Sequence, residues 1–186
     1  GGLARACRAG RLVSLIISDV LGDSLEVIAS GPTVPDTSTA AEALEILDRF
    51  DAESAGIAPA VFEFLRRKRL IDYGPPTCRV TNLVIGNNEA AVRAAADEAR
   101  RLGYQTEAES AEASEGVAED VGRRLAQRAV AMRAEGGKRC LVSGGEPVVA
   151  LVDPSRRGRG GRNQQLVLAT LTCLSSGGAA GAAILS

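Results

Sequence analysis

The sequence contains no histidine and no tryptophan, and only 3% of its residues are aromatic. Without histidine, the chain cannot build a Ser-His-Asp triad or a histidine-ligated zinc site. Because large aromatic side chains are scarce, the core has to be assembled from Ala, Val, Leu and Ile. Hydrophobic residues make up 45% of the chain, and its 186 residues suffice for one domain or for one domain and part of another.

The chain also lacks an excess of either charge and any long apolar run. Lys and Arg number 22 against 23 Asp and Glu, and a formal net charge of −1 gives no general attraction to nucleic acid. No stretch approaches the roughly 20 consecutive apolar residues of a membrane-spanning helix, and no signal-peptide pattern opens the chain. We therefore expect small-molecule partners, with no nucleic acid and no membrane among them. The oligomeric state is left open.

The four cysteines, at positions 7, 78, 140 and 173, are far apart and form no C-x-x-C pair. This spacing predicts reduced thiols in an intracellular protein, with a cytoplasmic location and a mitochondrial one as the alternative. The chain opens on GGLARACRAG without an initiator methionine, so we expect it to be an internal piece of a longer protein.

Apolar runs typical of strands alternate with segments of helical periodicity. Strands are predicted at 11–18, 25–30, 79–86, 104–110, 138–145, 146–153 and 176–186, and helices at 37–50, 56–70, 87–103, 114–137 and 162–174. The first strand is almost unbroken in its apolar character, which is typical of burial on both faces. Thr39 followed by Glu42 has the spacing of a capping box. The alternation predicts an α/β fold with a parallel or mixed sheet flanked by helices.

Three predicted strands lead into polar or glycine-rich turns. Asp19 and Asp23 follow the first strand, Asn87–Asn88 follow the strand at 79–86, and Ser143–Glu146 end the strand at 138–145. Ligands gather at the carboxyl ends of strands in open α/β sheets, so the three turns together favour a shared site. Carboxylate oxygens of this kind suit Mg²⁺. The alternative is that each segment is an ordinary turn or a helix cap, which is the simpler interpretation of Asn87–Asn88.

The segment PSRRGRGGRNQQLVLAT, residues 154–170, places four arginines and three glycines within nine residues before it turns apolar. A helix is expected to begin near Arg162, and its N-terminal end already favours anions. Arginines at this positive end call for a negative ligand, which Arg157, Arg159 and Arg162 could clamp. A solvated basic loop is the alternative. Single-stranded nucleic acid is disfavoured because no aromatics are interleaved. No G-x-x-x-x-G-K-[ST] occurs, and no G-x-G-x-x-G follows a strand.

Three long segments resemble the glycerate 2-kinase family, whose C-terminal region is called the MOFRL domain. They are SLIISDVLGDSLEVIASGPTVPD, VIGNNEAAVRAAADEARRLGYQ and CLVSGGEPVVALVDPSRRGRGGRNQQLVLA. The resemblance implies a two-domain α/β protein with its active site in the cleft. Residues 1–135 would be the C-terminal part of the Rossmann-like N-terminal domain, and residues 138–186 part of the MOFRL domain. It also implies a fragment lacking both ends, with the second α/β domain only partly present.

The activity implied by this resemblance is the phosphorylation of glycerate to 2-phosphoglycerate, with ATP and Mg²⁺ as cofactors. The missing dinucleotide fingerprint disfavours the hydroxypyruvate reductase label that such proteins sometimes carry. Two alternatives remain open at this point. The chain could be a non-catalytic module that binds phosphate or nucleotide, or a partner-dependent fragment without an independent role.

The family motifs assign roles by position. Asp19, Gly22 and Asp23 match an S-D-V-x-G-D turn, and Arg162 lies in R-G-G-R-N-Q, where it resembles the transition-state cation. Asp19 and Arg162 are the implied catalytic residues, and Asp19 is the implied metal ligand. The positions implied to bind substrate or nucleotide are Asp23, Ser30, Gly31, Thr33, Asn87, Asn88, Ser143, Gly144, Gly145, Glu146, Arg159, Gly160, Gly161, Asn163 and Gln164. Gln165 departs from the family, which usually has Glu there.

Overall fold

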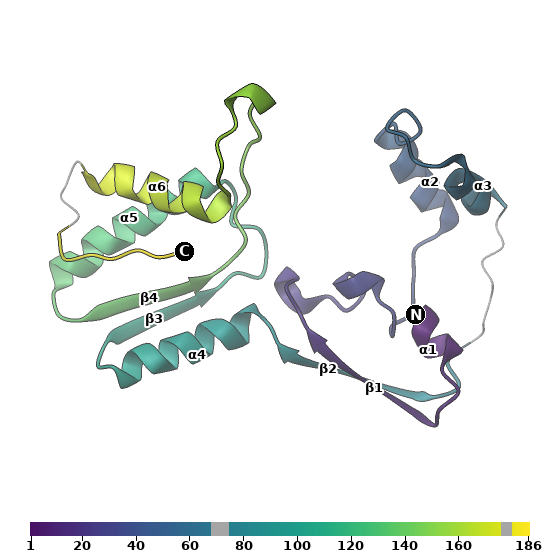
Figure 1. The fold of residues 1–186 in the computed structure, drawn as a ribbon. Helices are drawn as coiled ribbons and strands as arrows, with labels where there is room; N and C mark the ends of the chain where they lie inside the picture. The colour runs from purple at the N-terminus through teal and green to yellow at the C-terminus, as the bar shows by residue number, and fades with distance from the viewer. Residues whose placement is uncertain (68–74, 176–179) are drawn as a thin grey trace. The chain divides into compact units, whose positions relative to one another are not determined.

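A computed structural model describes residues 1–67, 75–175 and 180–186. The chain divides into two compact units (Figure 1). Unit 1 contains residues 1–16 and 25–84, and unit 2 contains residues 17–24 and 85–186. The elements are helices and short parallel sheets, which confirms the predicted α/β class. The domain assignment at 1–135 and 138–186 stays a prediction.

Unit 1 begins with helix α1 (Gly2–Ala6) and holds most of a two-stranded sheet, β1 (Arg11–Ile17) and β2 (Arg79–Gly86). The Arg79 N–H donates to the Gly10 carbonyl at 3.1 Å, and the Ser18 N–H donates to the Gly86 carbonyl at 2.8 Å. Both strands therefore run in the same direction. Residues of β1 alternate between half-buried and exposed, and Leu15 is 63% exposed. The expected burial of both faces is wrong for this chain, because only one face of the strand is covered.

Helices α2 (Ala40–Arg49) and α3 (Pro59–Arg66) pack against each other in unit 1. The predicted capping box opens α2: the Glu42 N–H donates to Thr39 Oγ1 at 3.2 Å, and the Thr39 N–H donates to the Glu42 carboxylate at 2.7 Å. Helix α3 starts with a proline at its first position and buries Phe62. The predicted continuation of α3 through 68–70 and part of the stop signal at 72–78 lie outside the described residues.

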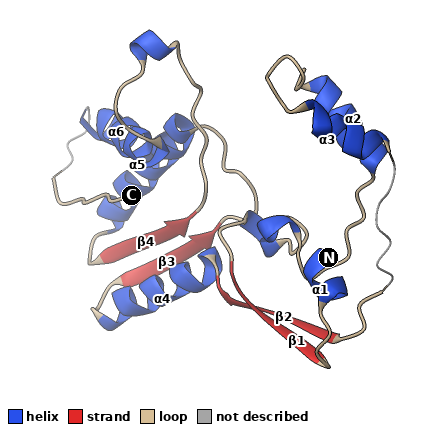
Figure 2. Cartoon of the chain, turned by 45° about the vertical axis from the view of Figure 1, so that its right-hand side comes forward, coloured by secondary structure: helices blue, strands red, loops and turns tan. Residues whose placement is uncertain are grey.

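Unit 2 is built on a parallel pair, β3 (Gln105–Ser110) and β4 (Arg139–Gly144), in register from Gln105 opposite Arg139 to Ser110 opposite Gly144. Helix α4 (Asn88–Arg101) packs against both strands, and helices α5 (Ala118–Glu135) and α6 (Arg162–Ser175) lie on the other side of the sheet (Figures 1 and 2). All three helices were predicted, and α5 ends at Gly136 with a positive φ of 73°.

The core of unit 2 lies between α5 and α6, where Ala118, Val121 and Leu166 are buried together. Close approach of the two helices depends on Gly122. A Cβ at this position would lie 2.6 Å from the Leu166 carbonyl oxygen and 2.8 Å from the Ala169 Cβ. The low aromatic content is therefore compatible with tight packing, because small side chains let the helix axes come near each other.

Two predicted strands are wrong, and a third is absent from the part of it that the structure describes. Residues 25–30 form a turn and a short 3₁₀ helix, η2 (Ile28–Ser30), in which Ala29 and Ser30 have positive φ. Among the residues that the structure describes, 146–153 pair through a single parallel bridge between Val117 and Val148 and have no strand partner along the rest of their length. No strand is present in 180–186, the described part of the predicted last strand. In the described part of the chain, no helix is long and apolar enough to span a membrane.

Candidate functional site

The acidic turn after β1 is held in shape by a local hydrogen bond and by its backbone conformation. Ser18 is buried, and its Oγ accepts the Val20 N–H at 3.2 Å. The chain then turns through the 3₁₀ helix η1 (Leu21–Asp23), in which Gly22 and Asp23 have φ of 77° and 51°. Glycine adopts this left-handed conformation freely, and aspartate tolerates it better than most residues. The turn leaves Asp19 exposed and Asp23 half-buried.

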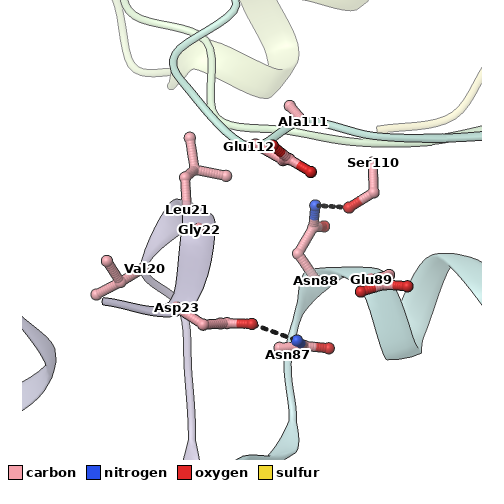
Figure 3. Close-up of a pocket in the computed structure, with 10 residues that line it drawn as sticks. All are labelled: Val20, Leu21, Gly22, Asp23, Asn87, Asn88, Glu89, Ser110, Ala111 and Glu112. Carbon is pink, nitrogen blue, oxygen red and sulfur yellow. Dashed lines mark hydrogen bonds between the residues drawn. The ribbon is translucent and has the colours of Figure 1, made fainter. Parts of the chain in front are cut away.

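Asn87 links this turn to helix α4. Its Oδ1 accepts the Ala90 N–H at 2.8 Å, which is the N-cap interaction expected of an asparagine at this position. Its Nδ2 donates to Asp23 Oδ2 (Figure 3). The cap interpretation of Asn87 is therefore confirmed, and the same side chain also orients the Asp23 carboxylate. One residue thus fixes both the start of α4 and the acidic turn.

Asn88 joins α4 to the carboxyl ends of both strands of the β3–β4 sheet. Its Nδ2 donates to Ser110 Oγ at 2.9 Å (Figure 3). It also donates to the Gly144 carbonyl at 3.0 Å. Gly144 has no room for a side chain, because a Cβ there would overlap Asn88 and lie 2.5 Å from Val92 Cγ2. Gly144, the first glycine of the SGGE segment (Ser143–Glu146), is therefore required because α4 packs directly against it.

These residues surround a cavity of about 350 Å³, shown in Figure 3. Its lining combines the acidic turn, the start of α4 and the end of β3: Val20, Leu21, Gly22, Asp23, Asn87, Asn88, Glu89, Ser110, Ala111 and Glu112. Three of these side chains are carboxylates and none is basic. These carboxylates would repel a phosphate that has no bound cation. Ligand hydroxyl groups could form hydrogen bonds with the amide and oxygen groups of the lining, and a nucleotide with its own bound cation would be repelled less.

The residues that could hold a metal do not form a closed centre. In residues 1–67, 75–175 and 180–186, no three His, Cys, Asp or Glu side chains lie close enough together to hold an ion. Magnesium usually takes only one or two protein carboxylates and completes its shell with water and phosphate oxygens. Asp19 or Asp23 fits that limited role.

The SGGE segment and the basic loop meet at an ion pair. Arg162, the first residue of α6, pairs with Glu146, two residues past the end of β4. Both side chains remain close to half exposed. Ser143 and Gly145 are exposed, and a Cβ on Gly145 would overlap the Glu115 carboxylate. The ion pair therefore shows that the start of α6 lies beside the end of β4.

The basic loop itself is exposed throughout residues 150–165. Asp153 accepts the Ser155 N–H at 2.9 Å, and its hydrogen bonds to the Ser155 hydroxyl and N–H lower the pKa of its carboxyl. Arg157 Nε donates to the Val152 carbonyl at 2.7 Å. Within the described chain, Arg159 has no ion-pair partner. One guanidinium of the loop is thus tied back to the chain, while another is available to a ligand.

The predicted helix start at Arg162 is confirmed, and the Gly161 carbonyl accepts the Gln165 N–H at 3.0 Å. Asn163 and Gln164 lie exposed in the first turn, with Gly160 just before it. The departure at Gln165 has a local reason. Its Nε2 donates to Glu119 Oε1 at 2.9 Å, and Glu119 Oε2 is buried with no hydrogen-bond partner among the described residues. A glutamate at 165 would place two carboxylates together, whereas the amide supplies a donor.

The A-S-G-P-T segment, residues 29–33, lies in unit 1 and contacts α1 and β2. Thr33 is buried and donates through Oγ1 to Asn82 Oδ1 at 2.6 Å. Gly31 has φ of 59°, and a Cβ at this position would lie 3.2 Å from the Glu26 Cα and carbonyl oxygen. Ser30 is exposed and also has a positive φ. These contacts give Gly31 and Thr33 a structural role within unit 1.

The structure brings together some of the predicted site residues. Asp23, Asn87 and Asn88 line the cavity, and the Gly144 carbonyl accepts a hydrogen bond from Asn88. No residue of the basic loop lines this cavity, and Asp19 does not line it either. Ser110 and Glu112 were missed by the sequence analysis, although they follow the same rule as the others because they stand at the carboxyl end of β3.

The fold and these turns define an α/β protein that gathers polar residues at the carboxyl ends of parallel strands, which is where ligand sites of open α/β sheets lie. Its relatives make this specific. A glycerate kinase of Macaca fascicularis is 36% identical over 90% of this chain and 52% of its own length. A D-glycerate 2-kinase of Thermotoga maritima is 32% identical over 94% of this chain and 40% of its own.

The fold agrees with these relatives. The crystal structure of a glycerate kinase from Thermotoga maritima matches with a TM-score of 0.68 at 31% identity, covering 94% of this chain and 41% of that one. A family described as "Domain of unknown function (DUF4147)" matches residues 1–66. The chain is similar to these glycerate kinases along nine tenths or more of its length, which confirms the resemblance found in the sequence. It spans about half or less of the length of these relatives.

Proposed function

We propose that the chain contributes to the ATP-dependent phosphorylation of glycerate, giving 2-phosphoglycerate. The observation that carries this proposal is the match to glycerate kinases along 90% or more of the chain, with about one residue in three identical. The ion pair between Arg162 and Glu146 adds support, because it joins the two motifs that are richest in charge and glycine.

The basic loop supplies the positive charge that phosphoryl transfer needs. In this reaction, charge builds on the oxygens of the transferred group, and positioning with electrostatic stabilisation accounts for most of the catalysis. Arg162 and Arg159 would bind the phosphate oxygens, and the glycines at 160 and 161 leave the backbone N–H groups accessible. Arginine stays protonated at all working pH values, so this role needs no histidine.

The acidic cavity would take the hydroxyl-bearing part of a substrate. Asn88 and Ser110 offer amide and hydroxyl groups, and Asp23 is held in place by Asn87. ATP would enter as its Mg²⁺ complex, with Asp19 or Asp23 contributing a carboxylate oxygen to the ion. The ion would weaken the repulsion between the three carboxylates of the lining and the triphosphate.

A second candidate function is binding of phosphate or nucleotide without turnover. The observation that favours it is that the chain spans only part of its relatives, namely 52% of one mammalian glycerate kinase and 39% of another. The basic loop and the cavity are present in full within this span. A chain of this kind would bind ATP and release no ADP.

The deciding experiment measures ADP release by the 186-residue chain with ATP, Mg²⁺ and D-glycerate, and identifies the product by ³¹P NMR. The proposal predicts glycerate-dependent ADP release and a phosphomonoester at the 2-hydroxyl. Arg162→Ala should remove most of the activity, whereas Arg101→Ala, an exposed arginine on α4, should leave it unchanged. ATP binding without ADP release would reject catalysis and support the second candidate. Transfer to the 3-hydroxyl would reject the proposed product.

A further inference from the structure

Two of the four cysteines lie together in unit 1. Cys7 follows directly after α1, and its N–H donates to the Leu3 carbonyl at 3.0 Å. Cys78 stands just before β2, and its Sγ lies 3.6 Å from the Ala4 carbonyl oxygen. Next to it, the Thr77 hydroxyl donates to the Cys7 carbonyl at 3.4 Å. Thr77 and Cys78, which are neighbours in the sequence, therefore both connect the start of β2 to α1 and the residue after it.

The two thiols differ in their surroundings. Cys78 is buried, with 8% of its surface exposed, whereas Cys7 is only half-buried. Burial raises the pKa of the Cys78 thiol, and its contact with the Cys7 thiol raises it further. Cys78 is thus shielded and protonated, and Cys7 is the member of the pair that a reagent in solution can reach.

We propose that Cys7 and Cys78 are a reversible thiol–disulfide pair, oxidised by a small-molecule disulfide such as oxidised glutathione. The Cys7 thiolate attacks one sulfur of the glutathione disulfide, forms a mixed disulfide and releases one glutathione thiolate. Cys78 then gives up its proton and attacks Cys7 Sγ, which forms the intramolecular disulfide and releases the second glutathione. Two protein thiols are oxidised, and one glutathione disulfide is reduced to two thiols.

The cross-link would stiffen a part of unit 1 that includes the A-S-G-P-T segment. The N–H groups of Leu3 and Ala4 donate to the Pro32 carbonyl at 3.0 and 3.2 Å. The segment in turn reaches β2 through Thr33 and Asn82. A disulfide closing the loop over residues 8–77 would fasten α1 to the start of β2, and it would stabilise the folded chain by restricting the unfolded one.

The test treats the full chain with oxidised glutathione, alkylates the remaining thiols and analyses it by non-reducing mass spectrometry and thermal unfolding. We expect a product lighter by two hydrogen atoms, a linked peptide pair containing Cys7 and Cys78, and a melting temperature several degrees higher that dithiothreitol reverses. Cys140→Ser should still form the cross-link. Cys7→Ser and Cys78→Ala should not form it.

Because Cys78 is buried, Cys78→Ala could destabilise unit 1. The exposed-side variant Cys7→Ser then decides the outcome, since it leaves the buried thiol in place. A wild-type chain that stops as a stable glutathione adduct at Cys7 would overturn the proposal. A cross-link through Cys140 or Cys173, or one between two chains, would overturn it as well.

Discussion

Arg162, at the first position of α6, forms an ion pair with Glu146, two residues beyond β4. The pair places a guanidinium of the basic loop against the SGGE segment (Ser143–Glu146). Two motifs that are separate in the sequence are therefore neighbours in the structure. Because both side chains are close to half exposed, the pair is screened by solvent. An anionic ligand can therefore recruit Arg162 without a large loss of folding free energy.

The first prediction follows from this exposure. Arg162→Ala should change the free energy of unfolding by less than about 1 kcal/mol, which is the usual range for an exposed ion pair. Urea denaturation followed by circular dichroism measures it. A loss several times larger would mean that the pair holds unit 2 together, and the arginine would then be structural.

Gly122→Ala should be destabilising, in spite of the better helix propensity of alanine. The added Cβ would lie 2.6 Å from the Leu166 carbonyl oxygen. Overpacking of this kind costs up to about 3 kcal/mol and propensity returns roughly 1 kcal/mol, so we expect a net loss of about 2 kcal/mol. Gly158→Ala is the matched control, because no atom lies within 4 Å of its added Cβ. Equal urea midpoints for the two variants would contradict the tight α5–α6 contact.

Asn88→Ala should remove the hydrogen bonds to Ser110 and Gly144 and destabilise the chain by about 1–2 kcal/mol. Hydrogen exchange should become faster at the carboxyl ends of β3 and β4, where the bonds are made. Arg93→Ala, an exposed change on the same helix, should alter neither quantity. Unchanged exchange in Asn88→Ala would show that α4 is held to the sheet by apolar packing alone.

The capping box of α2 should make stability depend on pH. Hydrogen bonds from the Thr39 hydroxyl and N–H lower the pKa of the Glu42 carboxyl below its ordinary value of 4.5. A pKa lowered by folding contributes stability above the unfolded pKa, and this contribution is lost as the pH falls through the folded pKa. Glu42→Gln should therefore lower the urea midpoint at neutral pH and approach the wild type near pH 3. A constant difference across this range would contradict the assignment.

Helix ends were predictable because their chemistry is local. Thr39 and Glu42 are three residues apart, and their mutual hydrogen bonds form wherever the helix starts. Gly136 stops α5 because it adopts the left-handed conformation at little cost. The start of α6 at Arg162 followed from the glycines before it and the apolar residues after it.

Strands and cavity residues were harder to predict because they depend on distant partners. Residues 146–153 have a strand-like composition, yet within the described chain only Val148 forms a β-bridge, with Val117. The pairing of Glu119 with Gln165 depends on how α5 and α6 pack, and no local pattern encodes it. Asp23, Asn87 and Asn88 were found because they follow the strand-end rule, whereas Ser110 and Glu112 were overlooked at the end of a strand to which the same rule applies.

Isothermal titration of the folded chain with ATP and Mg²⁺ tests the central claim most directly, namely that the arginine loop at the start of α6 binds the phosphate groups of a nucleotide. Wild type and Arg101→Ala should bind with the same affinity, and Arg162→Ala should bind at least about tenfold more weakly, as expected for the loss of a charged hydrogen bond. Equal affinities for wild type and Arg162→Ala, or no binding by the wild type, would contradict the claim.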